Sequence, residues 1–391
     1  MVFCDIASFY TPRGGGVSTY HNEKLAFFAA RGEHRYALVA PAAADEVEPV
    51  PGGTIYWLRG FRFDANYRHL YRARPLRRIL REIGPDVLEF GSPYLDYWVG
   101  SWAARGLGAV RTAYYHADFP DTYVAPILRR RLGRLADPAV RGLYRYVRLV
   151  FGRLDATFVA SRHIRDKLQA LGLTNLRHLP LGVNTAVFSP ARRSADLRRR
   201  LGVDGTGRLL LFAGRYRADK GLDVLLAALP RLLDDPAVHV AFAGTGPLAG
   251  AVGRWASDHS RVHDLGFIAD KERLAGLYAS ADVFISPGAW ETFGFGLREA
   301  VASGVPVVSA AAGAGAEFVS SSGCGLLFAP GEPADLVRAT LAIGRSDAAD
   351  RVRAARKALE SSHTWTHVFE AYVDQCRSIA AARVPGAPLG A

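Results

Sequence analysis

The residues best suited to chemistry are two glutamates, Glu291 and Glu299, on either side of a glycine-rich turn. An apolar strand predicted over 282–286 breaks at Pro287, and the turn at 293–296 lets backbone N–H groups approach a ligand closely. Helical spacing follows the turn, so we expect Glu291 in the loop after a strand and Glu299 on the next helix. Open α/β sheets bind ligands at that edge, where strands end and helices begin.

Two cations, Arg215 and Lys220, follow another predicted strand in the second half of the chain. The apolar run 209–213 predicts the strand, and the apolar spacing of 222–233 predicts the helix after it. Both charges then lie at the ligand edge of the sheet, where fixed cations suit an anionic ligand such as a diphosphate. The chain contains only five lysines, which favours a specific role for Lys220.

A three-glycine turn at 14–16 lies between a predicted strand, 2–7, and a predicted helix, 17–30. Free N–H groups and the helix dipole at such a turn favour an anion. Three consecutive glycines do not have the Gly-x-Gly-x-x-Gly spacing of dinucleotide sites, so an NAD-dependent oxidoreductase is the least favoured class. A flexible turn that binds nothing is the alternative for this loop taken alone.

His116 follows the predicted strand 110–115 and precedes a turn that contains Asp118 and Pro120. This position also lies at the ligand edge of a parallel sheet, which makes His116 a candidate site residue. A purely structural histidine is the alternative.

Strands and helices alternate along the whole chain, which predicts an α/β protein built from two parallel-sheet domains. A length of 391 residues exceeds what one ordinary core accommodates. The segment 179–190 is rich in proline and glycine, as linkers are, and we place the domain boundary within it.

The composition, 49% hydrophobic and 22% charged residues, is typical of a folded, soluble protein. No apolar run is long enough to span a bilayer, and residues 1–7 lack the charged region and cleavage site of a signal peptide. Three cysteines far apart in the sequence favour a reducing cytosol and no zinc site. No carboxylate or Cys/His cluster has the spacing of metal ligands, so we expect no metal site.

The formal net charge is +12, and it is concentrated in the first half of the chain. Residues 128–154 contain eight arginines and a single acidic residue, and residues 68–81 contain six arginines and none. Such segments attract anionic surfaces, either nucleic acid or acidic lipid. A solvated face without a partner is the alternative.

Four apolar residues within the first basic segment have helical spacing: Tyr144, Val147, Phe151 and Leu154. Arginines flank this stripe, as they do in helices that lie at a membrane interface. Packing against the protein core is the alternative, and we favour it slightly.

Five motifs, in this order, resemble those of the retaining, nucleotide-sugar-dependent glycosyltransferases of family four. They are Gly14–Gly16, Gly214-Arg215 with Lys220-Gly221, Gly244–Pro247, Gly266-Phe267 and the glutamates Glu291 and Glu299. Residues 181–190 also resemble that family's interdomain segment, with Asn184 where aspartate is more frequent. The resemblance covers nearly the whole chain and is strongest over 209–330.

The resemblance implies a GT-B fold, in which two Rossmann-like domains face each other across a cleft. Residues 1–184 would form the acceptor-side domain and residues 185–367 the domain that binds the nucleotide-sugar donor. A final helix, at about 368–384, would pack back on the first domain.

The resemblance also implies roles for individual residues. Arg215 and Lys220 would neutralise the donor diphosphate without a metal ion or cofactor, and His116 would contact the transferred sugar. Glu291 would face the sugar hydroxyls, and Glu299 would accept hydrogen bonds from the ribose. The other donor-binding residues would be Gly15, Gly16, Gly214, Gly246, Phe267, Thr292, Phe293 and Gly294.

A glycosidase also uses two carboxylates, as acid and nucleophile. We disfavour that function because Glu299 lies on the helix behind the loop, and because Arg215 and Lys220 suit an anionic donor better than a neutral glycan.

The run 115–120 looks like that of family members that glycosylate lipids, including diacylglycerol and phosphatidylinositol. We therefore expect a hexosyltransferase that moves sugar from a UDP- or GDP-linked donor to a membrane lipid or lipid-linked glycan. It would work in the cytoplasm, held at the inner face of the plasma membrane by its basic first-domain helices. A nucleotide-sugar epimerase of the same fold is the alternative. A non-catalytic nucleic-acid binder is a distant one, because the positive charge is segregated from the motif loops.

Overall fold

The computed structural model describes residues 1–12, 14–63, 67–343 and 345–383, and the chain divides into two compact units. Unit 1 comprises Met1–Leu181 and Trp365–Ala391, and unit 2 comprises Gly182–Thr364. The boundaries predicted at 184/185 and 367/368 each lie three residues further along the chain. The tail predicted to be frayed, 385–391, lies outside the described residues.

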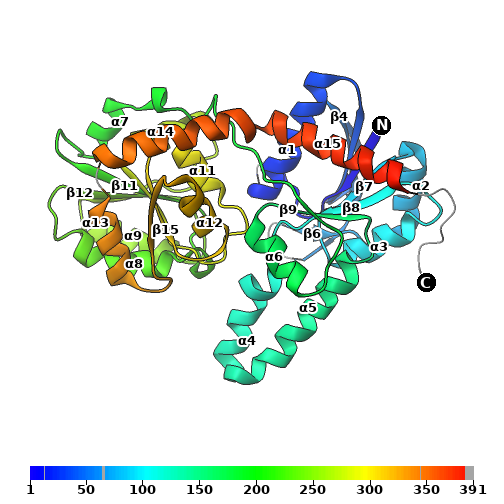
Figure 1. The fold of residues 1–391 in the computed structure, drawn as a ribbon, viewed down its shortest axis with the longest axis horizontal. Helices are drawn as coiled ribbons and strands as arrows, with labels where there is room; N and C mark the ends of the chain where they lie inside the picture. The colour runs from blue at the N-terminus through cyan, green and yellow to red at the C-terminus, as the bar shows by residue number, and fades with distance from the viewer. Residues whose placement is uncertain (13, 64–66, 344, 384–391) are drawn as a thin grey trace. The chain divides into compact units, whose positions relative to one another are not determined.

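Unit 1 is an α/β unit with helices on both sides of its sheet (Figure 1). Its strands are β1 (Val2–Ile6), β2 (Arg35–Ala42), β3 (Glu46–Val50), β4 (Gly53–Arg59), β5 (Phe61–Arg62), β6 (Arg68–His69), β7 (Val87–Phe90), β8 (Val110–Tyr114), β9 (Ala156–Val159) and β10 (Leu176–His178). Its helices are α1 (Gly16–Arg31), α2 (Ala73–Ile83), α3 (Leu95–Ala103), η1 (Pro120–Val124), α4 (Ala125–Leu132), η2 (Gly133–Ala136), α5 (Asp137–Phe151), α6 (Arg162–Ala170) and α15 (Trp365–Ala382).

The described residues of unit 1 form an eight-stranded sheet in the order β10-β9-β8-β7-β1-β2-β4-β3. Every neighbouring pair is parallel except β3 and β4, which are antiparallel. The chain therefore builds outward from β1 in both directions, and the strand order reverses beside β1. Ligands bind at such a reversal in open α/β sheets.

Unit 2 has the same kind of architecture (Figure 1). Its strands are β11 (Arg208–Ala213), β12 (Val238–Ala243), β13 (Val262–Asp264), β14 (Val283–Ser286), β15 (Val307–Ala310) and β16 (Gly325–Phe328). Its helices are η3 (Pro190–Arg192), α7 (Ala195–Arg200), η4 (Ala218–Lys220), α8 (Leu222–Leu232), α9 (Ala249–Asp258), α10 (Lys271–Ser280), α11 (Phe295–Ala302), α12 (Gly313–Ser322), α13 (Pro333–Ala342) and α14 (Arg345–Ser362).

The described residues of unit 2 form a six-stranded sheet in the order β13-β12-β11-β14-β15-β16, and all of its pairs are parallel. Alternate residues of β11 face opposite sides, as the strand period of two requires. Leu209 and Leu211 enter one buried apolar cluster, and Leu210 and Phe212 enter the other. Both faces of the sheet are thus covered, which explains why the strands read as continuous apolar runs.

Local signals located several helix ends correctly. Ser161 caps α6, because its side chain accepts a hydrogen bond from the N–H of Ile164. The final helix is separate from the one before it, since α14 ends at Ser362 and α15 begins at Trp365.

Two features of unit 1 differ in detail from the sequence-based expectation. The basic segment near 68–82, which the sequence predicts as one helix, becomes helical only at Ala73, because β5 and β6 pair first as a short antiparallel ribbon. The sheet is not wholly parallel, because Pro51 and Gly52 make a two-residue turn that pairs β3 with β4. Gly52 has φ +86, which a turn of this kind requires and which glycine adopts without strain.

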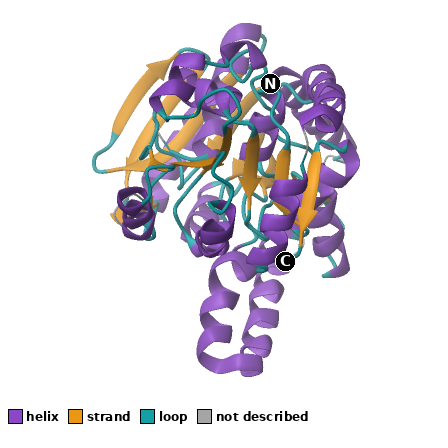
Figure 2. Cartoon of the chain, turned by 90° about the vertical axis from the view of Figure 1, so that its left-hand side faces the viewer, coloured by secondary structure: helices purple, strands orange, loops and turns teal. Residues whose placement is uncertain are grey.

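The apolar stripe at 144–154, on α5 and just after it, belongs to the core, so the core-packing alternative is confirmed. Tyr144, Val147, Phe151 and Leu154 are all buried within the unit 1 apolar cluster. Figure 2 shows that α4 and α5 nevertheless extend away from the sheet as a helical hairpin, with η2 at its tip. We call α4, η2 and α5 the helical hairpin below. No helix in the described part of the chain is long and apolar enough to cross a membrane.

Candidate active site

Most of the predicted site residues lie at the carboxyl edge of the unit 2 sheet. Gly214 and Arg215 follow β11, Gly246 follows β12, Phe267 follows β13, and Glu291 follows β14. Because the four strands are parallel neighbours, their ends meet at one edge. Backbone hydrogen bonds join the loops there, from Gly214 N to Ala243 O (2.9 Å) and from Gly244 N to Gly266 O (2.8 Å).

Lys220 and Glu291 form an ion pair at the point where the strand order of unit 2 reverses. β11 and β14 are adjacent, and the chain proceeds from them in opposite directions across the sheet. Lys220 follows β11 and Glu291 follows β14, and their Nζ and Oε1 atoms are 2.7 Å apart. The structure thus joins two predicted site residues that are 71 positions apart, at the place where open sheets bind ligands.

A close backbone approach at Gly221 sets the geometry of this pair. Gly221 has φ +66, and a Cβ added there would lie 2.3 Å from the carbonyl oxygen of Pro287. Any side chain at this position would push the two loops apart, so the glycine lets Lys220 reach Glu291.

Arg215 remains 53% exposed, although its guanidinium lies 3.5 Å from Asp219. Arg217 approaches the same carboxylate more closely, at 2.6 Å. Asp219 is therefore an anchor for this loop. The position of Asp219 four residues after Arg215 could have indicated this contact, but our sequence analysis did not use it.

The loop that follows Glu291 is held by a buried arginine that the sequence analysis missed. The guanidinium of Arg298 lies 3.7 Å from the centre of the Phe293 ring and also donates a hydrogen bond to the Phe293 carbonyl. Phe293 is buried, so its backbone rather than its ring is available to a ligand. Gly294 caps α11 with φ +80, and Thr292 is half-buried.

Glu299 lies on α11 in a half-buried position. Burial raises the pKa of its carboxyl to about 7, against the opposing effects of a hydrogen bond from Tyr278 and the charge of Lys271. Burial also raises the pKa of Tyr278 well above its usual value, and Glu299 and Glu291 both add to that rise. Both glutamates therefore lie near one buried tyrosine, and a substantial fraction of Glu299 is protonated at pH 7.

Three predicted site residues belong to unit 1, at the carboxyl edge of its own sheet. Gly15 caps α1 and Gly16 is its first residue, and both are exposed. His116 follows β8, with its ring stacked on Tyr114 at 4.7 Å and edge-on to Tyr20 at 5.1 Å. Burial lowers the pKa of His116 to about 3, with further contributions from His21 and Lys24, so the imidazole is neutral at pH 7.

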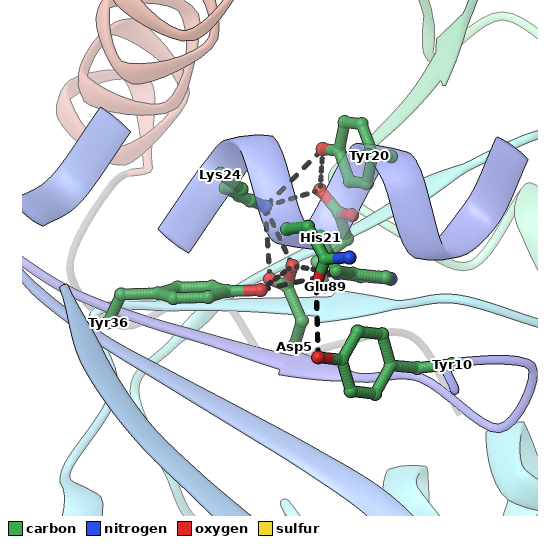
Figure 3. A network of polar contacts seen from close by, with 8 residues as sticks. Asp5, Tyr10, Tyr20, His21, Lys24, Tyr36 and Glu89 are labelled. Carbon is green, nitrogen blue, oxygen red and sulfur yellow. Dashed lines mark hydrogen bonds and ion pairs between the residues drawn. The ribbon is translucent and has the colours of Figure 1, made fainter. Parts of the chain in front are cut away.

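A buried polar network lies beside His116, and the sequence analysis did not predict it (Figure 3). Lys24 of α1 lies 2.9 Å from Asp5 of β1 and 3.3 Å from Glu89 of β7. The hydroxyl of Tyr36 donates to Asp5 at 2.8 Å. All four side chains are buried. Burial opposes the charge of Lys24, but Asp5 and Glu89 together raise its pKa above the ordinary value. Burial raises the pKa of Glu89 to about 7, despite the nearby Lys24.

Tyr20 connects this network to the histidine. Its hydroxyl donates to Glu89 at 3.2 Å, and its ring is the one that lies edge-on to His116. The C-terminal helix α15 covers the other side, where the Tyr372 ring lies 4.1 Å from the Lys24 Nζ. A rigid charged cluster thus supports the ring against which His116 packs.

Among the described residues, no group of three or more His, Cys, Asp or Glu side chains is arranged to hold a metal ion. The three cysteines are free and buried.

Comparison with known proteins identifies similar sequences over most of the chain. Residues 14–187 match the family model described as Glycosyltransferase Family 4, and residues 207–345 match the model described as Glycosyl transferases group 1. A GDP-mannose-dependent alpha-(1-6)-phosphatidylinositol dimannoside mannosyltransferase of Mycobacterium tuberculosis is 30% identical over 373 residues, which cover 92% of each chain. A GDP-mannose-dependent alpha-mannosyltransferase of Corynebacterium glutamicum is 29% identical over 82% of this chain and 75% of its own.

Solved structures with the same fold include two enzymes of more distant sequence. Sucrose-phosphate synthase from Thermosynechococcus elongatus has a TM-score of 0.80 at 19% identity, covering 98% of this chain and 100% of its own. WaaG, a glycosyltransferase involved in lipopolysaccharide biosynthesis, has a TM-score of 0.68 at 17% identity, covering 95% and 98%. These likenesses confirm the expected GT-B fold, with its two Rossmann-like units.

Proposed function

Because the chain belongs to glycosyltransferase family 4, we propose that it transfers mannose from GDP-mannose to a membrane lipid or lipid-linked glycan, with retention of the anomeric configuration. Two relatives similar over most of this chain are named as GDP-mannose-dependent enzymes, and one of them as acting on a phosphatidylinositol dimannoside. The observation that carries the proposal is the Lys220–Glu291 pair at the switch point of unit 2, with Arg215 exposed in the same loop.

The charges at this edge suit the departure of a nucleoside diphosphate. As the bond between sugar and phosphate breaks, negative charge builds up on the leaving group, and fixed cations stabilise that charge. We assign this role to Arg215 and Lys220. Glu291 holds Lys220 in place at 2.7 Å and presents its carboxylate to the sugar hydroxyls. Glu299 accepts hydrogen bonds from the ribose hydroxyls.

The remaining donor contacts follow the family resemblance. The backbone of residues 292–294 lies beside the sugar, Gly214 and Gly246 allow close approach to the nucleotide, and the exposed ring of Phe267 lies along the base. From unit 1, we assign Gly15 and Gly16 to the donor phosphates. His116 contacts the sugar as a neutral hydrogen-bonding group, because its low pKa makes it a poor acid at pH 7.

A donor panel tests the proposed specificity. GDP-mannose should raise the unfolding temperature more than UDP-glucose, UDP-galactose or ADP-glucose, because a ligand at one hundred times its Kd stabilises by about 2.7 kcal/mol. Radiolabelled GDP-mannose should then transfer label to an organic-extractable lipid. Label recovered only as an altered nucleotide sugar would instead indicate an epimerase.

We expect activity without added divalent metal. Arg215 and Lys220 supply positive charge where a metal ion acts in other transferases. The measurement is the initial rate of mannose transfer in EDTA, compared with the rate in Mg²⁺ or Mn²⁺. Complete loss in EDTA that either metal restores would contradict this expectation.

We further propose that the enzyme works at the cytoplasmic face of an anionic membrane and that arginines of the helical hairpin attract it there. Arg129, Arg130, Arg131 and Arg134 are exposed on α4 and η2. Each basic residue near such a surface contributes about 1 kcal/mol, and the effect fades beyond a Debye length. Changing all four to serine should weaken sedimentation with phosphatidylglycerol vesicles at low salt and leave the GDP-mannose thermal shift unchanged.

A matched control removes the same charge from unit 2. Arg199, Arg200, Arg338 and Arg353 are exposed, and each pairs with a nearby aspartate on its own helix. Changing these four to serine should leave vesicle binding intact. Equal losses in the two variants would mean that net charge, and not the hairpin, causes attraction.

A further inference from the structure

Helix α3 of unit 1 presents an apolar stripe to solvent. Its inner face, with Tyr97 and Ala103, is buried. Its outer face carries Leu95, Trp98 and Trp102, which are 40%, 41% and 38% exposed. Their spacing of three and four residues places them on one side of the helix. The outer face of a surface helix is ordinarily polar, and so a row of three large apolar side chains indicates a contact surface.

Each tryptophan ring contacts a polar side chain of a neighbouring helix. The indole N–H of Trp98 donates to the hydroxyl of Tyr146 on α5 at 3.1 Å. The guanidinium of Arg77 on α2 lies 5.6 Å from the centre of the Trp102 ring. These contacts restrict both rings, so little conformational entropy remains to be lost when they bind an apolar medium.

Exposed cations lie on the neighbouring helix α2 and just after α3. α2 packs against α3 and exposes Arg74, Arg78 and Arg81, and Arg105 follows the end of α3. No acidic side chain in the described ranges forms an ion pair with any of these four arginines. Figure 1 shows α2 and α3 as neighbouring helices of unit 1.

We propose that α3, with the arginines of α2, is an interfacial membrane-binding surface that inserts Trp98 and Trp102 between the headgroups and acyl chains of an anionic bilayer. Tryptophan is enriched at that depth because its ring is apolar and its N–H is polar, and arginines beside it meet lipid phosphates. The role of this surface in catalysis at a membrane rests on the proposed function. The evidence for the surface itself is the exposed α3 stripe.

A bilayer fits this surface better than a second protein does. A stable protein interface buries about 800 Å² on each partner, whereas three half-exposed side chains provide a narrow row. A bilayer needs no matching shape, and it supplies the negative charge that Arg74, Arg78 and Arg81 lack within the protein. The α3 surface would also act differently from the helical hairpin: the hairpin arginines attract at long range, whereas inserted rings retain the protein at high salt.

Quenching of tryptophan fluorescence tests the insertion directly. Vesicles of phosphatidylglycerol and phosphatidylcholine with brominated acyl chains, free of any mannose acceptor, should quench the full-length protein. The Trp98→Phe/Trp102→Phe variant should bind these vesicles but lose most of the quenching, because the inserted reporters are gone. Trp290→Phe is the matched control, since Trp290 is also 41% exposed but lies in unit 2, and it should keep the quenching.

A second pair of substitutions measures what the rings contribute to binding. The exposed part of each ring is on the order of 100 Å², and its burial corresponds to a partition factor of at least about ten. Trp98→Ser/Trp102→Ser should therefore lower vesicle binding in 0.5 M salt by about a hundredfold. Far-UV circular dichroism and the GDP-mannose thermal shift should stay as in the wild type, which separates this loss from misfolding.

Three outcomes would overturn the proposal. They are unchanged quenching in the Trp98→Phe/Trp102→Phe variant, unchanged high-salt binding in the serine variant, and a concentration-dependent dimer that the serine variant abolishes. Quenching by a protein that transfers no label in the GDP-mannose assay described above would support the α3 surface and contradict the proposed function, so the two failures are distinguishable.

Discussion

Replacing Lys220 with alanine should lower the turnover number for the proposed mannose transfer by about 10²–10³-fold at saturating donor, which is the usual effect of removing one group that stabilises transition-state charge. Arg215→Ala should have a similar effect. The Lys220–Glu291 pair is partly exposed, so its loss should change the free energy of unfolding by only about 1 kcal/mol or less. The variants should therefore lose activity while keeping nearly all of their stability, as expected of residues that serve the reaction.

The measurement is steady-state transfer of labelled mannose, with urea unfolding of each variant alongside. Arg217→Ala is the matched control, because Arg217 lies in the same loop and also pairs with Asp219. That variant should keep most of its turnover. Near-wild-type turnover in either Lys220→Ala or Arg215→Ala would refute the assignment of the diphosphate site.

The second large effect concerns stability. Lys24→Met should destabilise unit 1 by about 3–5 kcal/mol, because it removes the only lysine of the buried network in the described structure and takes the nearest permanent cation from the buried Asp5 carboxylate. Burial alone would raise the pKa of Asp5, but the charge of Lys24 is the main cause that lowers that pKa below its ordinary value. Without Lys24 that carboxylate must bind a proton or admit water.

Hydrogen exchange of amides in β1, β7 and α1 measures this loss within unit 1. Lys357→Met, at an exposed lysine of α14, should change stability by less than about 0.5 kcal/mol. The triple variant Lys24→Met/Asp5→Asn/Glu89→Gln should recover part of the lost stability, since no charge then remains buried. If Lys24→Met alone leaves exchange in β1 unchanged, the network does not stabilise the sheet.

Glu89 and Glu299 should also make stability depend on pH. A carboxyl whose pKa is raised in the folded state contributes stability that is fully present below its unfolded pKa. That contribution is lost as the pH rises through the folded value, here about 7 for both groups. The free protein should therefore be less stable at pH 8 than at pH 6 through these two groups.

Local patterns in the sequence were enough to predict which loops of unit 2 lie at the carboxyl edge of its sheet, where the candidate site is. Two loops, 214–220 and 287–291, each follow a run of apolar residues that forms a strand. The ends of parallel strands necessarily meet at one edge of the sheet. The glycines were informative for the same reason, since Gly221 and Gly294 both adopt positive φ beside the predicted charges. Features of this kind are determined by residues that are close in the sequence, so they can be predicted without knowledge of the fold.

Other features depended on contacts between distant residues. In the sequence each of the charges Asp5, Lys24 and Glu89 is isolated. Only the pairing of β1 with β7 and the packing of α1 bring Lys24 Nζ within 3.3 Å of both carboxylates. The stripe of α5 and the stripe of α3 have the same apolar spacing, yet Tyr144 and Val147 are buried whereas Trp98 and Trp102 face solvent.

The sequence by itself thus determined the alternation of strands and helices, the family, and the loops that carry Arg215, Lys220 and Glu291. Only the tertiary structure decided which charges are buried together and which apolar faces remain uncovered. The physical reason is that spacing along the chain specifies which side chains share a face, whereas burial depends on what packs against that face. In this protein the element that covers Lys24, helix α15, begins 341 positions later in the chain.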